Sequence, residues 1–474
     1  MKVALVAVTA AVALAACGPA PAPPRRPGGG PVSQPASAPA SQRADHTPLP
    51  LTVAERREEL KFLRRAIEET YAHFELKRRQ WGVDWDDLEK RYWPHFEKAE
   101  TFELYDSLML RLLAEFHDSH LAYRREKSGG RAGRHVHVSY TVGLRTEWVE
   151  NQLIITEVEP GSSAARAGLK PGDRILAVRG QAAASYFARG VNRRAWSRPE
   201  AAWHDEAQLL TPIVLEAEDE PAPLRLSIED PVAGMRAVLL PLVKREPSPR
   251  PAFELKFEGD IAILRLRTFD AGNSPDEMPE HFKQIAARAK GLVLDLRGNR
   301  GGIDRIAHGA LQHLIDRQAT VASYRVRLSQ RARDARAQWR KLKALPDGFS
   351  EPVPVTVEPK GPRFAGPVVA LVDLGCRSSC ETLAAGLKAT GRATLVGERT
   401  AGTSGAPIRV RLPHSGARVG IPTWSMMTPE GRPIEGLGIS PHEEVPLTRA
   451  AVRAGIDPPR ARGLAILKGK LGRK

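Results

Sequence analysis

The chain has few cysteines, few aromatic residues and no spacing of metal ligands. Only 3 of its 474 residues are Cys, too few for a disulfide framework. Aromatic residues make up 6% of the chain. No basic run is interleaved with them, so we expect no nucleic-acid partner. His, Cys and Asp do not occur at zinc-site spacing, so the sequence predicts neither a metal nor another cofactor and does not support a metalloprotease.

The composition is otherwise that of a globular protein. Apolar residues make up 42% and charged residues 27% of the chain, which excludes a wholly disordered chain, a collagen and a polytopic membrane protein. At about 150 residues per domain, the length indicates roughly three domains. Lys and Arg number 71 against 55 Asp and Glu, a formal net charge of +16. Such a charge suits anionic surfaces, and a basic scaffold for envelope polymers is one reading of it.

The first segment predicts export. Lys2 precedes an apolar run, Val3–Ala16, which is shorter than the roughly 20 residues of a membrane span and typical of a secretory signal peptide. Leu14-Ala15-Ala16-Cys17 resembles a bacterial lipobox, which implies that Cys17 is lipidated; an ordinary signal peptide with a chance Cys is the alternative. We therefore expect a lipoprotein signal peptide over residues 1–17 and a lipid anchor on the periplasmic face of the bacterial outer membrane.

Three further regions follow from composition and periodicity. Residues 18–50 are rich in Pro and Ala and predict a disordered tether. Residues 51–128 show helical periodicity, opened by a capping box of Thr52 and Glu55. Residues 247–474 alternate strand and helix, which indicates an α/β core.

The segment between the helices and the core resembles a PDZ domain, which we place at residues 129–246. Val142-Gly143-Leu144 would form its carboxylate-binding loop, where successive backbone N–H groups bind a peptide C-terminus. Pro160-Gly161-Ser162 would start its short helix, and Lys170-Pro171-Gly172-Asp173 would turn into a strand. An unrelated β-hairpin is the alternative. The resemblance implies peptide or protein substrates, recognised in part through free C-termini.

Two strand-to-helix junctions of the core are candidates for chemistry. The first is Asp295-Leu296-Arg297-Gly298-Asn299-Arg300-Gly301-Gly302, where glycines allow close backbone approach and N–H groups could face an oxyanion. A tight turn or a phosphate loop is the alternative, although the Walker Lys-Ser/Thr pair is absent.

The second junction is Cys376-Arg377-Ser378-Ser379-Cys380-Glu381. A Ser at a helix N-terminus suits a nucleophile, but Ser is also a common helix cap. Cys376 and Cys380 flank Ser378, and the sequence leaves open whether they are free apolar thiols or a bridge. A thiol nucleophile is a remote further option.

Taken together, these motifs, the PDZ-like segment and Pro433-Ile434-Glu435-Gly436-Leu437-Gly438 resemble the C-terminal processing (tail-specific) peptidases. The likeness runs from about residue 55 to 450 and includes the tricorn and interphotoreceptor-retinoid-binding relatives. It implies an α/β multi-domain fold with an N-terminal helical region, a PDZ domain and a ClpP/crotonase-like serine peptidase core.

The resemblance also assigns a nucleophile and a base. Ser378, three residues before Glu381, corresponds to the family nucleophile, but Thr403 stands where the processing peptidases carry their Lys base. The Ser–Lys dyad is therefore absent. The tricorn-like branch uses Ser-His-Ser-Glu instead, which implies His120 as the base, although His117 is a nearby competitor.

The same branch implies supporting roles for four further residues. Ser119 and Glu435 would orient or polarise the pair, and the amides of Gly301 and Ser379 would form the oxyanion hole. Alternatively, Ser119 is only a polar residue at the C-terminal end of a helix, and Glu435 is only a solvated turn residue. We predict an envelope-anchored serine endopeptidase acting through an acyl-enzyme. The alternative is an inactive, PDZ-containing peptide-binding lipoprotein, suggested by the missing Lys.

Overall fold

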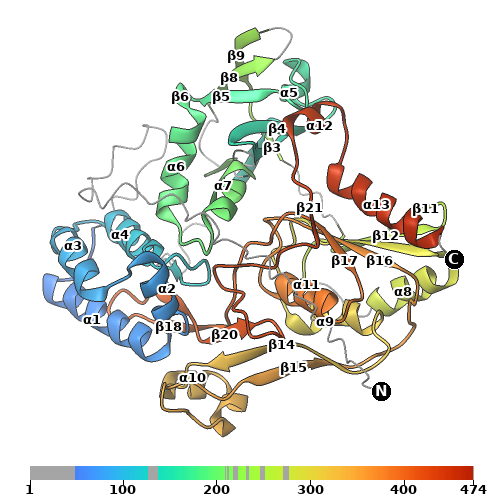
Figure 1. Cartoon of the computed structure of the whole chain (residues 1–474). Helices are drawn as coiled ribbons and strands as arrows, with labels where there is room; N and C mark the ends of the chain where they lie inside the picture. The colour runs from blue at the N-terminus through green and yellow to red at the C-terminus, as the bar shows by residue number, and fades with distance from the viewer. Residues whose placement is uncertain are drawn as a thin grey trace, which may run out of the picture. The chain divides into compact units, whose positions relative to one another are not determined.

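A computed structural model describes residues 48–125, 137–208, 210, 213–216, 222–230, 234–245, 251–270 and 277–472. Figure 1 shows the arrangement of their helices and strands. The predicted signal peptide, the lipidation site Cys17 and the predicted tether up to residue 47 lie outside the described residues. Within the described ranges, no helix has the length and apolar character needed to cross a membrane.

Four helices open the described chain. The predicted capping box is present: the Thr52 hydroxyl accepts from the Glu55 N–H, and the Glu55 carboxylate accepts from the Thr52 N–H. The apolar faces of the helices are buried together, as their periodicity predicts. The helices are α1 (Val53–Thr70), α2 (Phe74–Trp81), α3 (Trp85–Glu97) and α4 (Phe102–Ala114).

The N-terminal helices share their core with strands from the C-terminal half of the chain. Strand β1 (Ala122–Arg124) pairs antiparallel with β19 (Arg418–Pro422), which pairs with β18 (Pro407–Arg411). Ile408, Val419 and neighbouring residues of β18 and β19 are buried in the same hydrophobic cluster as the helices. The turn between α4 and β1, which carries Ser119 and His120, is therefore held against the C-terminal half.

The PDZ-like region contains a sheet in the order β3-β4-β5-β8-β9, with β6 paired to β5. Its short helix α5 (Ser163–Arg166) is capped by Ser162, and the predicted strand Arg174–Val178 is β5. Residues 183–208, called the PDZ-side insertion, form helices α6 (Ala183–Arg193) and α7 (Pro199–Gln208). The strands are β2 (His137–Thr141), β3 (Leu144–Val149), β4 (Gln152–Val158), β6 (Gln181–Ala182), β7 (Ile213–Glu216), β8 (Leu224–Asp230), β9 (Gly234–Leu240) and β10 (Val243–Lys244).

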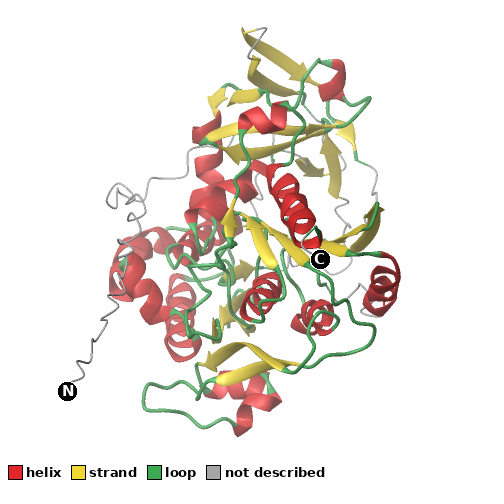
Figure 2. Cartoon of the chain, turned by 45° about the vertical axis from the view of Figure 1, so that its right-hand side comes forward, coloured by secondary structure: helices red, strands yellow, loops and turns green. Residues whose placement is uncertain are grey.

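The α/β core is built on a sheet in the order β11-β12-β13-β16-β17-β21, in which β12 to β21 run parallel. The central strands β13 and β16 are buried along their whole length because both faces of the sheet are covered. Helices α8, α9 and α11 pack on one face and α13 on the other (Figure 2). Bounds are β11 (Phe253–Glu258), β12 (Ile261–Leu266), β13 (Gly291–Asp295), β16 (Val368–Val372), β17 (Thr394–Gly397), β21 (Glu443–Glu444), α8 (Glu277–Arg288), α9 (Asp304–Gln312), α11 (Ser379–Ala389) and α13 (Pro458–Leu471).

The two candidate junctions follow β13 and β16, which are neighbours in this sheet. Because both strands end at the same edge, their loops meet there. A second sheet of three strands, β15-β14-β20, packs against α11. The remaining elements are β14 (Ala319–Val326), α10 (Gln330–Ala335), η1 (Ala337–Lys341), β15 (Val353–Val357), β20 (Trp424–Met427) and α12 (Arg449–Arg453).

Candidate active site

Ser378 lies at the tight turn between β16 and α11 with a strained backbone. Its φ of 52° and ψ of −123° are unusual for a residue with a side chain. Its N–H is shared between the carbonyl of Thr403 and the Glu381 carboxylate, each at 3.2 Å. Ser378 caps α11, and the strain at this cap is of the kind that folds retain at functional positions.

Glu381 ties this turn to the segment that follows β17. Its carboxylate is fully buried and accepts four hydrogen bonds. Besides the Ser378 N–H, the donors are the Thr400 hydroxyl at 2.5 Å and the N–H groups of Gly402 and Thr403, each at 2.7 Å. Burial raises the pKa of Glu381 to about 7, although these hydrogen bonds lower it. Thr403, which stands where the processing peptidases carry their Lys, is thus held in place by Glu381.

This pKa predicts a pH-dependent stability. In the unfolded chain the pKa of a Glu carboxyl is near its ordinary value of 4.5. Between about pH 4.5 and 7 the folded protein therefore binds a proton at Glu381 that the unfolded chain does not bind. The contribution of Glu381 to stability is full below this window and declines as pH rises through it, by on the order of 3 kcal/mol. Denaturant unfolding of the parent and of Glu381→Gln at several pH values should show this decline in their difference. A pH-independent difference would contradict it.

The turn 376–380, called the nucleophile turn after the proposed role of Ser378, borders a cavity of about 610 Å³. His120 from the α4–β1 turn and Ser378 both line it, with Thr403 on the same wall. The structure therefore brings the predicted nucleophile and the predicted base to one cavity. Its other lining residues are Thr268, Asp270, Arg300, Gly301, Gly302, Ile303, Asp304, Arg305, Arg336, Ser379, Thr382, Ser404, Gly405, Ala406, Pro407, Trp424, Met426 and Ile434.

The backbone of His120 is held by Asp118, a residue that sequence reasoning missed. The His120 N–H donates to Asp118 Oδ1 at 2.9 Å, and Asp118 Oδ2 accepts from the Tyr71 hydroxyl at 2.8 Å and contacts His73 Nδ1 at 3.0 Å. Although burial raises it, the hydrogen bond and charge of His73 hold the pKa of Asp118 below its usual range. His120 Nδ1 is buried and has no hydrogen-bond partner among the described residues.

The competitor His117 does not line the cavity. Its φ is 49°, and its ring stacks on Trp81 with centroids 4.1 Å apart. Its carbonyl accepts from Lys77 Nζ at 2.6 Å. The geometry therefore favours His120 over His117 as the histidine available to Ser378.

Ser119 and Glu435 lie behind the cavity wall. The Ser119 hydroxyl donates to Thr403 Oγ1 at 3.2 Å. Glu435 is fully buried: Oε1 pairs with Lys77 Nζ at 2.6 Å, and Oε2 accepts from the Ser404 N–H at 2.8 Å. The solvated-turn alternative for Glu435 is therefore wrong. Glu435 thus contacts the backbone of Ser404, a residue that lines the cavity. Its partner Lys77, on the buried face of α2, is a second residue that sequence reasoning missed.

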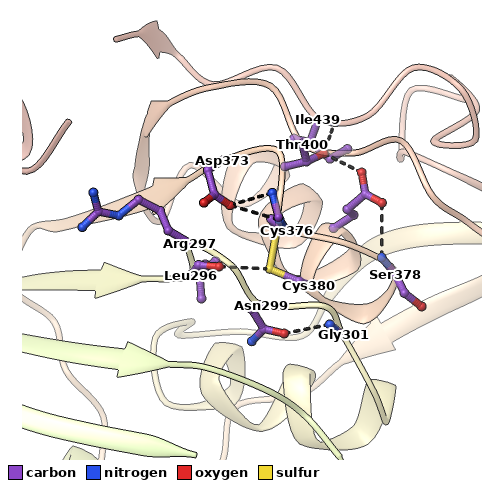
Figure 3. Close-up of a disulfide and its surroundings, with 12 residues drawn as sticks. Leu296, Arg297, Asn299, Gly301, Asp373, Cys376, Ser378, Cys380, Thr400 and Ile439 are labelled. Atoms are coloured by element: carbon purple, nitrogen blue, oxygen red, sulfur yellow. Dashed lines mark hydrogen bonds between the residues drawn. A yellow bond between two sulfur atoms is a disulfide. The ribbon is translucent and has the colours of Figure 1, made fainter. Parts of the chain in front are cut away.

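The glycine-rich loop 295–302, called the oxyanion loop after its proposed role, lies against the turn 376–380 that carries Ser378. A Cβ on Gly301 would come within 2.8 Å of Ser378 Cβ and 2.6 Å of the Arg377 carbonyl oxygen, so only glycine fits. The Gly301 N–H, however, already donates to Asn299 Oδ1 at 2.8 Å (Figure 3). Among the described residues the N–H of Gly302 has no acceptor, and that of Ser379, at the first position of α11, has none within its helix. The main-chain N–H groups of Ser379 and Gly302, two residues that line the cavity, are therefore available to a substrate oxygen.

Cys376 and Cys380 form a disulfide that brackets Ser378. Their Cα atoms are 5.5 Å apart, both side chains are fully buried, and Figure 3 shows the bridge and Ser378. This decides between the two states that the sequence left open. Because both sulfurs are bonded, neither is a nucleophile in this state.

One group of possible metal ligands occurs among the described residues: His73, Asp118 and Glu435, all buried. Lys77 already supplies a cation to Glu435, and Tyr71 and the His120 N–H satisfy Asp118. The donors around the two carboxylates are therefore sufficient without an ion.

Comparison with known proteins identifies the core. Residues 260–445 match the model of peptidase family S41, and residues 154–186 match that of the PDZ domain. The core is a family S41 peptidase domain. The chloroplastic C-terminal processing peptidase of Tetradesmus obliquus is 26% identical over 398 residues, which are 81% of this chain and 76% of that protein. The carboxyl-terminal-processing protease of Synechocystis is 25% identical over 414 residues, 84% of this chain and 83% of that protein.

A solved structure shows the same fold. Mature CPAF complexed with lactacystin aligns with a TM-score of 0.66 at 16% identity and covers 88% of this chain and 98% of that chain. The predicted fold class, with N-terminal helices, a PDZ domain and a peptidase core, is confirmed. So is the predicted enzyme class, a serine-type peptidase. The domain boundaries and the roles of individual site residues stay predictions.

Proposed function

We propose that this S41 homologue is an endopeptidase that cleaves peptides or proteins through an acyl-enzyme on Ser378, with His120 as the general base. The observation that carries the proposal is that these two residues, from distant parts of the chain, line one cavity. The strained turn that presents Ser378 and the free amides beside it support the same reading.

The chemistry follows from the groups on the cavity wall. The Ser378 hydroxyl attacks a substrate carbonyl and passes its proton to the His120 imidazole. The oxygen that gains the negative charge is stabilised by N–H groups of Ser379 and Gly302, or of Gly301 if it leaves Asn299. His120 returns the proton to the leaving amine, and water then hydrolyses the ester.

The surroundings support a His base over a Lys base. Thr403 occupies the position of the family Lys, and the buried Lys77 is paired with Glu435. We therefore place the chain in the branch without a Ser–Lys dyad. In this reading Ser119 and Glu435 act on the segment 403–404 and orient the site through it.

A fluorophosphonate probe tests the proposal. Its phosphorus is attacked by an activated Ser hydroxyl, fluoride leaves, and the Ser carries the label. We expect labelling of the parent at Ser378 by peptide mass spectrometry and none of Ser378→Ala. A folded parent without label would reject the proposal and favour the alternative, an inactive peptide-binding protein.

The PDZ domain supports recognition of free peptide C-termini. Gly143 has a φ of 75°, and a Cβ there would lie 2.1 Å from Ser162 Cβ, so the loop needs glycine. Its N–H donates to the Thr141 hydroxyl at 2.9 Å, an acceptor that a carboxylate could replace, beside Val142 and Leu144. We expect an extended peptide to bind several-fold more weakly when its C-terminus is amidated, because the charge is lost. Equal affinities in fluorescence anisotropy would contradict this role.

We also propose lipid anchoring at Cys17 in the bacterial envelope. The support is the Leu14-Ala15-Ala16-Cys17 run after an apolar segment. More than one acyl chain is needed for stable anchoring, and mature lipoproteins carry more than one. Cys17→Ser should move the protein from the membrane to the soluble fraction and abolish palmitate incorporation. An unlabelled parent with unchanged fractionation of the variant would contradict the proposal.

A further inference from the structure

One carboxylate from the PDZ-side insertion joins the two loops that form the candidate active site. Asp205 lies on α7, and Figure 1 shows the place of this helix. Its Oδ2 pairs with Arg377 Nη1 at 2.8 Å, and its Oδ1 lies 3.3 Å from Arg300 Nη2. Arg377 immediately precedes the proposed nucleophile Ser378, and Arg300 immediately precedes the Gly301-Gly302 pair of the oxyanion loop.

The inner of the two pairs is buried. The side chains of Asp205 and Arg377 are 5% and 10% exposed. Arg377 also donates to the Ala201 carbonyl at 3.4 Å and lies over the Trp196 ring at 5.5 Å. The side-chain partners of Arg377 thus come from α7 and the residues leading into it. A buried guanidinium without its carboxylate is strongly unfavourable, so the pair fixes the position of Arg377.

A main-chain hydrogen bond also connects Arg377 to the oxyanion loop. The Arg377 N–H donates to the Asn299 carbonyl at 3.0 Å, and Asn299 Oδ1 accepts from the Gly301 N–H. The two loops are therefore joined through their backbones as well as through Asp205. A second contact from the same insertion, Arg198 Nη1 to the Thr400 carbonyl at 2.6 Å, reaches the segment that Glu381 fixes.

We propose that Asp205 is a positioning residue for the peptidase site. Its single carboxylate sets the separation between the nucleophile turn and the oxyanion loop by binding one arginine from each. The inference rests on the proposed function. It predicts that loss of the Asp205 charge lowers reactivity at Ser378 without changing substrate binding.

The test compares Asp205→Asn with a matched variant, Glu229→Gln. Glu229 also bridges two arginines, Arg174 at 3.1 Å and Arg449 at 2.8 Å, but neither it nor they line the cavity. For Asp205→Asn we expect kcat and the rate of fluorophosphonate labelling to fall at least about tenfold. KM should stay within about twofold. Asp205→Glu should retain more activity than Asp205→Asn, and Glu229→Gln should keep the parental values.

The outcomes separate this inference from the proposed function. A parent that is not labelled rejects both. A labelled parent together with an Asp205→Asn protein of parental kcat and labelling rate rejects the positioning role alone, whatever its melting temperature. If Asp205→Asn does not fold, Arg300→Gln removes only the outer pair, whose arginine side chain is 56% exposed. Its labelling rate should fall several-fold, and an unchanged rate overturns the inference.

Discussion

Ser378→Ala is expected to lower peptide turnover by at least about 10³-fold, with the fold preserved. The flanking cysteines cannot form the acyl-enzyme because they are bonded to each other, which leaves the Ser378 hydroxyl as the proposed nucleophile. Alanine has no β-branch and keeps the backbone contacts of the turn, including the N–H bonds to Thr403 and Glu381. Initial rates with a fluorogenic peptide and circular dichroism of the same preparation measure the two effects.

The neighbouring serine provides a control for Ser378→Ala. Ser379 is buried, and its hydroxyl has no hydrogen-bond partner among the described residues. Ser379→Ala keeps the main-chain N–H that is proposed to stabilise the oxyanion, so its turnover should stay within a few-fold of the parent. A Ser378→Ala protein that turns over substrate as fast as Ser379→Ala would mean that another nucleophile does the chemistry.

His120→Ala is expected to cause a loss of similar size, on the order of 10³-fold, because the Ser378 hydroxyl loses its proton acceptor. The double variant should be little worse than either single variant, since the two residues act as one unit. Turnover of the three variants, measured side by side, gives this comparison. Thr403→Lys should not restore the activity of His120→Ala.

Two other residues with a basic side chain, the competitor His117 and Lys388 on α11, serve as comparisons for His120. His117→Ala removes a ring that stacks on Trp81 outside the cavity, and turnover should survive. Lys388 lies in the last turn of α11, roughly 14 Å along the helix axis from its start, and its Nζ donates to the Ser440 carbonyl at 2.7 Å. If His120→Ala kept near-parental turnover while His117→Ala or Lys388→Ala lost it, the residue whose loss abolished turnover would be assigned as the base.

The parts of the site that are local in sequence could be predicted. The apolar runs of β13 and β16 end in a glycine-rich turn and a helix start, and parallel strands bring such ends together. Ser378 and the glycines beside it are recognisable because each junction is a short continuous motif. The placement of His120 came from the family resemblance, since no spacing rule links a turn after α4 to a turn after β16.

The parts that depend on distant pairs could not be predicted. Lys77 and Asp205 look like ordinary charged residues on helices, and only the folded arrangement buries each against its partner. The hydrogen bond from the Gly301 N–H to Asn299 Oδ1 depends on the rotamer of the Asn299 side chain, which a sequence motif does not predict. The bridge between Cys376 and Cys380 needed the distance between their Cα atoms, which the sequence left open.

The pairing of β1 with β19 has a consequence for the order of events during synthesis. The strand that follows His120 finds its partner only after residues 418–422 have been made, and contacts so far apart in sequence form slowly. During synthesis the proposed base His120 is therefore made long before the proposed nucleophile Ser378, and β19, the strand that pairs with the segment after His120, is made later still. We expect nascent chains to have no peptidase activity until nearly all of the core has been translated.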